Sequence, residues 1–393
     1  MTRILFVYHV SSIGGGSYCL LNLLKAIDRN AFEPVVLLPN RGPLCDEIEK
    51  LRMEIFYFPI LHLYPYNKPL LRMSTLKSLY LIERCKKGFK EVLKRVAPDV
   101  VYLNTMMLFP YLKTVKECGC KTVLHVREHW PLEEHCWQLE RVRKIVYEYT
   151  DKLIAINRYS ASIFPEKKAA IVYDWIDMDA RRGGPSLEEL LGEDCADKKV
   201  YLFTGGLQPI KGTIEVLRAF SREIKGDDRR LLVLGVDSTM NWSGIKGKIK
   251  KVLSTLGYKT YKERVVRLCE GDSRIICKPA MYNITDLMEH VKGYISFFTI
   301  PHANLALAES IIVGTQAIAA QTDEAFEYSN EGKLALLFPF GDEKTFIDAW
   351  RKLDIGQGIS DKLLKEGAKS LRQCFSSEMN AYIFNQALKE LVS

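Results

Sequence analysis

The chain has 393 residues, of which 47% are hydrophobic and 26% are charged. This length predicts two domains, since a domain usually holds about 100–200 residues, and the composition suffices for two hydrophobic cores without any low-complexity segment. No apolar run approaches the ~20 residues needed to cross a bilayer, and no signal peptide opens the sequence. We therefore expect a cytoplasmic protein.

The positive charge is concentrated in the N-terminal half. Residues 1–182 contain 28 Lys plus Arg and 20 Asp plus Glu, which accounts for the whole net charge of +8. This asymmetry indicates either an anionic partner, such as a membrane surface, a lipid phosphate or nucleic acid, or an ordinary solvated surface. The ten cysteines show no metal-ligand spacing, and reduced thiols are the better expectation.

The first domain is predicted to open with a strand, a glycine turn and a helix. Residues 3–10 form a nearly continuous apolar run, three glycines follow, and residues 18–27 have helical spacing. This succession is typical of a parallel, doubly wound α/β unit. Further strands are expected at residues 32–39, 99–103, 121–126 and 152–156, with a basic helix at about 74–96.

A polar, glycine-rich break near residues 179–197 separates this domain from a second alternation of strands and helices. We expect a first domain at 1–182, a second at 183–375, and a terminal helix at about 376–393 that packs back on the first. The second domain should contain strands at 199–204, 230–234, 274–277, 293–298 and 316–320, with a helix at 212–224. Two Rossmann-like domains would meet at a cleft where the carboxyl ends of both sheets bind ligands.

The first glycine turn includes Gly15 and Gly16, which have no Cβ to obstruct the approach of a phosphate. The turn is not G-x-G-x-x-G, and no acidic residue ends the second strand, so the ribose contact of a dinucleotide enzyme is missing. A sharp turn without a ligand is the alternative.

A second glycine turn, at Gly205 and Gly206, is followed by Lys211 at the start of the next helix. The lysine adds a full charge to the partial positive charge of a helix N-terminus, and both favour a diphosphate. The alternative is a surface lysine beside a tight turn.

Residues 301–320 predict a loop, a short apolar helix and a buried strand. Glu309 lies among apolar neighbours on that helix, where a carboxylate needs a donor partner. The helix start at Asn304, Leu305 and Ala306 offers backbone N–H groups to an anion. Together they suit a phosphorylated sugar-ribose ligand, whereas a glutamate that points at solvent is the alternative.

His125 is expected at the carboxyl end of a strand, as a ligand contact or as a satisfied loop histidine. With Glu128 and His129 it matches a zinc-peptidase pattern, but that chemistry needs a helix and this segment reads as a strand, so we expect no metal. The pair Asp177 and Asp179 resembles the D-x-D of another sugar-transferase fold and carries little weight.

Residues 59–72 mix aromatic, aliphatic and basic side chains and lead into the basic helix at 74–96. This mixture favours a peripheral contact with the inner face of an anionic membrane, with a buried loop beside a solvated helix as the alternative. Nucleic acid is not expected, because no base-stacking platform accompanies the charge.

Four segments in one order resemble a retaining glycosyltransferase of the GT-B fold, specifically glycosyltransferase family 4. They are the glycines at 14–16, the junction at 171–177, the turn at 205–212 and the stretch at 304–320. The resemblance implies a UDP-sugar or GDP-sugar donor, no cofactor, and a polysaccharide, glycan or lipid-linked acceptor. It implies that Lys211 binds the diphosphate of the donor, that Glu309 binds the ribose, and that residues 303–306 contact the phosphate and the sugar. It also implies that Gly15 and Gly16 close over the donor, that His125 contacts the donor sugar, and that the backbone around Met281 contacts the base.

Two positions depart from the family pattern. Pro301 replaces the earlier of two glutamates, and Gly206 replaces the arginine that accompanies the diphosphate lysine. These departures motivate an alternative, a catalytically silent nucleotide-sugar-binding or scaffolding subunit that assists a partner transferase. A nucleotide-sugar epimerase on the same double fold is a third hypothesis.

Overall fold

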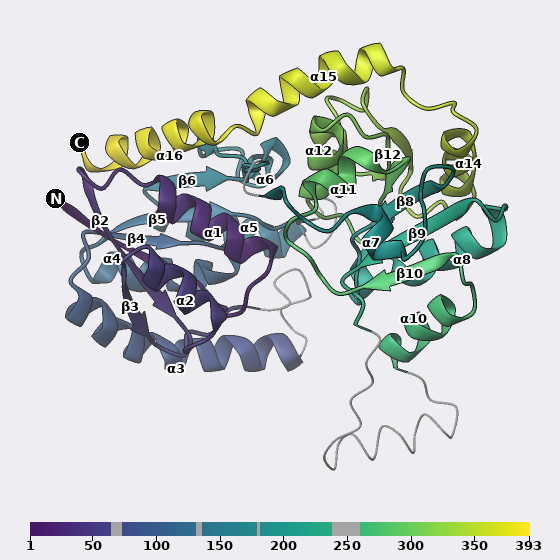
Figure 1. Cartoon of the computed structure of the whole chain (residues 1–393). Helices are drawn as coiled ribbons and strands as arrows, with labels where there is room; N and C mark the ends of the chain where they lie inside the picture. Colours follow the sequence, from purple (N-terminus) through teal and green to yellow (C-terminus); the bar gives the residue numbers. More distant parts are fainter. Residues whose placement is uncertain (64–72, 131–135, 179–180, 238–259) are drawn as a thin grey trace. The chain divides into compact units, whose positions relative to one another are not determined.

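The computed structural model describes residues 1–63, 73–130, 136–178, 181–237 and 260–393. They form two compact units, one of Met1–Trp175 with Cys374–Ser393 and the other of Ile176–Gln373. Unit 2 thus begins shortly before the boundary expected at residue 182. Each unit contains its own parallel sheet with helices on both faces (Figure 1).

The sheet of unit 1 has seven parallel strands in the order β3-β2-β1-β4-β5-β6-β7. The strands are β1 (Thr2–Val7), β2 (Phe32–Leu38), β3 (Glu54–Tyr57), β4 (Val100–Leu103), β5 (Lys121–Val126), β6 (Lys152–Ala155) and β7 (Ala169–Ile171). The helices are α1 (Gly15–Ala26), α2 (Pro43–Lys50), α3 (Met73–Val96), the 3-10 helix η1 (Met106–Tyr111), α4 (Leu112–Glu117), α5 (Cys136–Tyr149), α6 (Arg158–Ser162) and α16 (Ser377–Val392).

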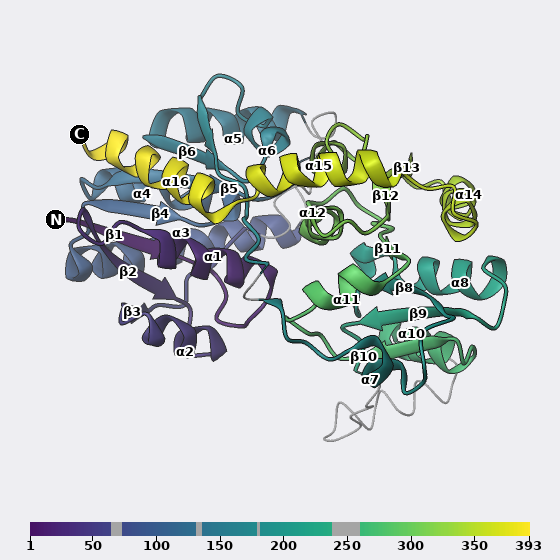
Figure 2. The same ribbon diagram turned by 45° about the horizontal axis from the view of Figure 1, so that its top comes forward.

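Side chains of β1 alternate between two cores, because successive residues of a strand point to opposite faces of the sheet. Ile4 and Phe6 pack with α1, α2 and α16, whereas Leu5 and Val7 pack on the other face with α3, α4 and α5 (Figures 1 and 2). The C-terminal helix α16 is joined to unit 1 by Asn385, whose Nδ2 donates to the carbonyl of Ala26 at 2.8 Å.

The sheet of unit 2 has six parallel strands in the order β10-β9-β8-β11-β12-β13. The strands are β8 (Lys199–Phe203), β9 (Arg229–Leu234), β10 (Ile275–Lys278), β11 (Gly293–Ile295), β12 (Ala317–Gln321) and β13 (Leu336–Pro339). The helices are α7 (Leu187–Leu191), the 3-10 helix η3 (Pro209–Lys211), α8 (Thr213–Glu223), α10 (Tyr261–Glu270), α11 (Thr285–His290), α12 (Leu305–Ile312), α13 (Asp323–Tyr328), α14 (Glu343–Asp354) and α15 (Asp361–Cys374).

Both sheets have the strand order of a doubly wound Rossmann-like domain, as the sequence predicted. The order reverses between β1 and β4 in unit 1 and between β8 and β11 in unit 2, and such folds bind ligands outside the carboxyl ends of the strands at this point. Within the described residues, no helix combines the length and the apolar character that a bilayer crossing requires.

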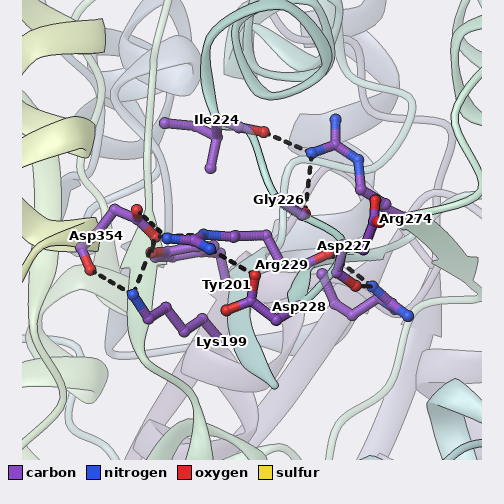
Figure 3. A network of polar contacts seen from close by, with 10 residues as sticks. Lys199, Tyr201, Ile224, Gly226, Asp227, Asp228, Arg229, Arg274 and Asp354 are labelled. Atoms are coloured by element: carbon purple, nitrogen blue, oxygen red, sulfur yellow. Dashed lines mark hydrogen bonds and ion pairs between the residues drawn. The ribbon is translucent and has the colours of Figure 1, made fainter. Parts of the chain in front are cut away.

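The amino ends of the unit 2 strands are held by a network of polar contacts (Figure 3). Arg229 donates to the carboxylate of Asp354 at 2.8 Å, and the Tyr201 hydroxyl donates to it at 2.7 Å. Burial opposes ionisation of Asp354, but these hydrogen bonds outweigh it and lower the pKa of the carboxyl group. The network links the starts of β8 and β9 to the end of α14, and its role is therefore structural.

Candidate functional site

The turn after β8 places Lys211 at the carboxyl edge of the unit 2 sheet. Gly206 has a φ of 58° and Gly212, the N-cap of α8, has a φ of 68°, a region that favours glycine. A Cβ on Gly206 would lie 2.9 Å from the carbonyl oxygen of Gly235, so the loops after β8 and β9 touch through their backbones. In this conformation, position 206 has no room for a side chain.

The ammonium group of Lys211 has little to neutralise it. Its one hydrogen bond within the described residues is to the carbonyl of Thr204, at 3.4 Å, and no carboxylate there forms an ion pair with it. Burial lowers the pKa of Lys211, because desolvation disfavours the charged form. A partly buried cation without an acidic partner is suited to an anionic ligand.

The loop between β11 and α12 lies directly against this turn. The backbone N–H of Thr299 donates to the carbonyl of Ile210 at 2.8 Å, and a Cβ on Gly212 would meet the ring of Phe297. The structure therefore brings Lys211, Gly205 and Gly206 to the same edge of unit 2 as the loop that leads to α12.

The helix α12 begins at Leu305, with Asn304 as its N-cap residue and Ala306 in the first turn. The Asn304 side chain does not cap the helix; its Nδ2 donates to Ser296 at 2.8 Å, and its Oδ1 accepts from the hydroxyl of Tyr294 at 3.4 Å. That hydroxyl also contacts Thr204 at 3.1 Å. The helix start keeps its backbone N–H groups without a side-chain cap, while Tyr294 links it to the Lys211 turn.

Glu309 is buried in α12, with 3% of its surface exposed, and forms an ion pair with Arg181. Arg181 also donates from Nε to the carbonyl of Tyr282 at 2.9 Å and lies over the Tyr282 ring at 5.1 Å. Sequence reasoning predicted that Glu309 needs a donor, but it did not identify Arg181. The sequence did contain one signal for this partner, since two adjacent arginines, Arg181 and Arg182, lie in the predicted linker.

Met281 follows the carboxyl end of β10 and is partly buried. It lies beside Tyr282, so the loop assigned to the nucleotide base and the Glu309 carboxylate share one partner, Arg181. Pro301 is also partly buried, and the adjacent His302 contacts the ring of Phe298 at 5.8 Å between centroids.

The first glycine turn lies in unit 1, where α1 begins at Gly15 after the N-cap Gly14, without a side-chain cap. A Cβ on Gly16 would come within 2.7 Å of the Tyr8 hydroxyl, whereas one on Gly14 or Gly15 would meet nothing within 4 Å. Gly16 thus permits a close approach of Tyr8, and the other two glycines leave the backbone open.

His125 lies in β5 and is completely buried. Its Nδ1 is 2.9 Å from the Tyr102 hydroxyl and 3.2 Å from Oδ1 of Asn104, while its Nε2 has no hydrogen-bond partner among the described residues. Desolvation, followed by the charge of Arg127, lowers the pKa of His125 well below its usual value. The imidazole is therefore neutral at physiological pH.

Arg127 and Asp174 form a largely buried ion pair in unit 1 that sequence reasoning did not identify as a pair. The guanidinium Nη2 lies 2.6 Å from Oδ2 of Asp174, and the two side chains are 11% and 15% exposed. Nη1 has no hydrogen-bond partner among the described residues. Burial disfavours the charged form, but Asp174, Cys19 and Tyr8 together outweigh it and raise the pKa of Arg127.

The zinc-like pattern at residues 125–129 does not assemble a ligand set. The carboxylate of Glu128 accepts from the Thr105 hydroxyl and from the backbone of Met106, and His129 stacks on Tyr159 at 4.4 Å. Among the residues that the structure describes, no group of three His, Cys, Asp or Glu side chains could hold a metal ion. Asp179 and residues 64–72 lie outside the described residues.

A surface hollow of about 510 Å³ lies between the ends of α8 and α14 in unit 2. It is lined by Glu223, Ile224, Lys225, Asp348, Arg351, Lys352, Asp354 and Ile355. These elements end at the amino edge of the sheet, beside the network of Figure 3. Because ligands of such sheets bind at the carboxyl edge, the hollow is not the candidate site.

No protein-family model matches the sequence, and no curated protein matches it either. Among solved structures, HepE of Anabaena in complex with UDP-glucose is similar, with a TM-score of 0.71 and 16% identity over 99% of this chain and 100% of that chain. Sucrose-phosphate synthase from Thermosynechococcus elongatus has a TM-score of 0.69 and 12% identity over 100% and 99% of the two chains.

A glycosyltransferase from Rickettsia africae has a TM-score of 0.68 and 15% identity, over 100% of this chain and 99% of that chain. At these identities the likeness establishes the architecture. The chain has the two-domain, Rossmann-like GT-B fold that the sequence predicted.

Proposed function

We propose that this protein is a retaining glycosyltransferase, similar to family 4, that moves a sugar from a UDP-sugar or GDP-sugar to a polysaccharide, glycan or lipid-linked acceptor. The observation that carries the proposal is the partly buried Lys211, which forms no ion pair within the described part of the chain, beside the uncapped start of α12 in unit 2. The GT-B fold supports it, since HepE, a similar structure, was solved in complex with UDP-glucose.

In this proposal, the diphosphate leaving group accepts hydrogen bonds from Lys211 and from the backbone of Leu305 and Ala306. Preorganised donors of this kind stabilise charge that develops in the transition state, so no metal ion is required. Glu309, oriented by Arg181, holds the ribose, and the backbone near Met281 contacts the base. The donor contacts expected of Gly15, Gly16 and His125 in unit 1 stay predictions that rest on the family resemblance.

The first test is a thermal-shift panel of UDP, GDP and ADP sugars, because a true donor stabilises the folded protein by mass action. We expect one nucleotide class to raise the melting temperature. Lys211→Ala should weaken its binding at least tenfold, since a charge-assisted hydrogen bond contributes about 1.5–3 kcal/mol. Lys225→Ala is the matched control, because Lys225 lines the hollow at the opposite edge of unit 2. Equal affinities of the wild type and Lys211→Ala would remove Lys211 from the site.

Turnover distinguishes the transferase from the silent subunit. Purified protein incubated with a stabilising nucleotide sugar and a membrane extract should release the nucleoside diphosphate and extend an acceptor. Binding without consumption of any donor would favour the scaffolding alternative, and conversion of the sugar without an acceptor would favour the epimerase.

We further propose that α3 contacts an anionic membrane surface. Its first turns expose Met73, Leu76 and Tyr80, at 79%, 43% and 61%, on the same face as exposed Lys77 and Arg84. Apolar side chains between basic ones suit an interfacial contact. Later lysines contribute less, because Lys86, Lys90 and Lys94 form ion pairs with Glu83, Glu117 and Glu91.

The membrane contact is tested by sedimentation with phosphatidylcholine vesicles that contain or lack phosphatidylglycerol. The double variant Lys77→Gln/Arg84→Gln should pellet less with the anionic vesicles than the wild type. Lys90→Gln/Lys94→Gln removes the same charge from paired positions and should change pelleting little. Equal pelleting of all three proteins would leave α3 as solvated surface.

A further inference from the structure

Two cysteine side chains of unit 2 meet outside the candidate site. Cys269 lies in the last turn of α10 and Cys277 lies in β10, and their Sγ atoms are 2.6 Å apart. Both thiols pack at the margin of the core that β8, β9 and α8 form. The chain between them is short, so the two sulfurs are held together by local structure rather than by a distant contact.

The pair is accessible from solvent. Both residues are only partly buried, and among the described strands β10 lies at the edge of its sheet, beside β9. A partly exposed thiol can be reached by a small reagent. Other cysteines of the protein, such as Cys19 and Cys45, are buried within unit 1.

The two thiols also differ in acidity. The hydrogen bond between the sulfurs couples their ionisation, lowering the pKa of Cys277 and raising that of Cys269. A thiolate is the nucleophile in thiol–disulfide exchange. The geometry therefore provides an attacking sulfur and a second thiol within bonding reach of it.

We propose that Cys269 and Cys277 form a redox-active pair that small disulfides, such as oxidised glutathione, convert reversibly into an intramolecular disulfide. The Cys277 thiolate attacks one sulfur of the small disulfide, the S–S bond breaks, and one small thiolate leaves and takes up a proton. Cys269 loses its proton, attacks Sγ of Cys277 in the mixed disulfide, and releases the second small thiol. Two electrons pass from the protein to the small disulfide.

In a reducing compartment such a bond forms only when the thiol pool becomes oxidised. The bond would join the end of α10 to the strand that leads into Lys278. The Lys278 carbonyl accepts the backbone N–H groups of Gly235 and Val236 at 2.9 and 3.0 Å. Oxidation is thus expected to stiffen the β9 and β10 edge of unit 2, whatever ligand the protein binds.

The test uses the full chain in glutathione buffers of increasing oxidised fraction, followed by rapid alkylation and peptide mapping without reduction. We expect the Cys269–Cys277 disulfide to be the first intramolecular disulfide to form, and dithiothreitol to reverse it. In Cys269→Ser, Cys277 should accumulate as a mixed disulfide with glutathione, because the resolving thiol is missing. In Cys277→Ser, Cys269 should lose its partner and the intramolecular disulfide should no longer form.

The control is Cys118→Ser, which removes a partly buried cysteine of unit 1 and should leave the Cys269–Cys277 disulfide unchanged. Circular dichroism of each protein verifies that it remains folded. The proposal is overturned if Cys269 and Cys277 of the folded wild type are both recovered as alkylated thiols in oxidised buffer. It is equally overturned if Cys277 pairs mainly with another cysteine.

Discussion

Replacing Gly206 by alanine should destabilise unit 2 by more than its backbone angle alone explains. A side chain in the left-handed region costs about 1–2 kcal/mol, and Gly206 has a φ of 58°. The new Cβ would also lie 2.9 Å from the carbonyl oxygen and 3.3 Å from the Cα of Gly235. Separating two packed backbones costs about 1–3 kcal/mol more, so the total loss is roughly 2–5 kcal/mol.

A matched variant isolates the close approach. Gly192, the C-cap of α7 in unit 2, has a φ of 73°, and a Cβ there would meet nothing within 4 Å. Gly192→Ala should therefore lose only the conformational part, about 1–2 kcal/mol. Hydrogen exchange of peptides from β8 and β9 reports the local free energy of opening. If both variants lose the same stability, the contact with Gly235 contributes nothing and the reasoning is wrong.

The same geometry predicts the behaviour of Gly206→Arg. The arginine would start from the same obstructed Cβ, so it should destabilise unit 2 at least as much as alanine does. We also expect no gain in nucleotide affinity in the thermal-shift panel. A stable Gly206→Arg protein that binds UDP or GDP more tightly would contradict this reasoning. It would show that packing does not require glycine at position 206 and that a positive charge there improves nucleotide binding.

The remaining predictions concern two ion pairs of unit 2. Arg181→Ala leaves Glu309 buried without its cation and should lower the free energy of unfolding by about 3–5 kcal/mol. The double variant Arg181→Ala/Glu309→Gln should recover part of this loss. An unchanged melting temperature of Arg181→Ala would contradict the pairing. Asp354→Asn should be less stable than the wild type at pH 6 by about 1.5–3 kcal/mol. Because the folded pKa of Asp354 is lowered from 3.8, its contribution is complete above pH 3.8 and disappears as the pH falls through the folded pKa. The difference between the two proteins should therefore shrink in acid, and a difference that grows there would refute the linkage.

Central strands were predictable because the sequence around them is nearly continuous and apolar, as strands buried on both faces require. β1, β5 and β8 follow this pattern and lie within or near their expected ranges. β3 (Glu54–Tyr57), β7 (Ala169–Ile171) and β13 (Leu336–Pro339) were missed, and all three are edge strands. These three strands are short and partly exposed, so their sequences carry little periodic signal.

Local chemistry also determined part of the candidate site. The glycine turn before Lys211 and the helix start at Asn304 follow from residues that adjoin one another, and the structure brings both to one edge of unit 2. The need of Glu309 for a donor followed from its apolar neighbours. These inferences required only short stretches of chain, because neighbouring residues suffice to predict a turn, a helix start or a buried position.

Tertiary structure alone decided which residues far apart in sequence meet. It selected Arg181 as the partner of Glu309 and Asp174 as the partner of Arg127. It buried His125 against Tyr102, and it brought Gly206 against Gly235. Such pairs depend on which strands become neighbours in a sheet, and that choice is made by the packing of the whole domain rather than by any one segment.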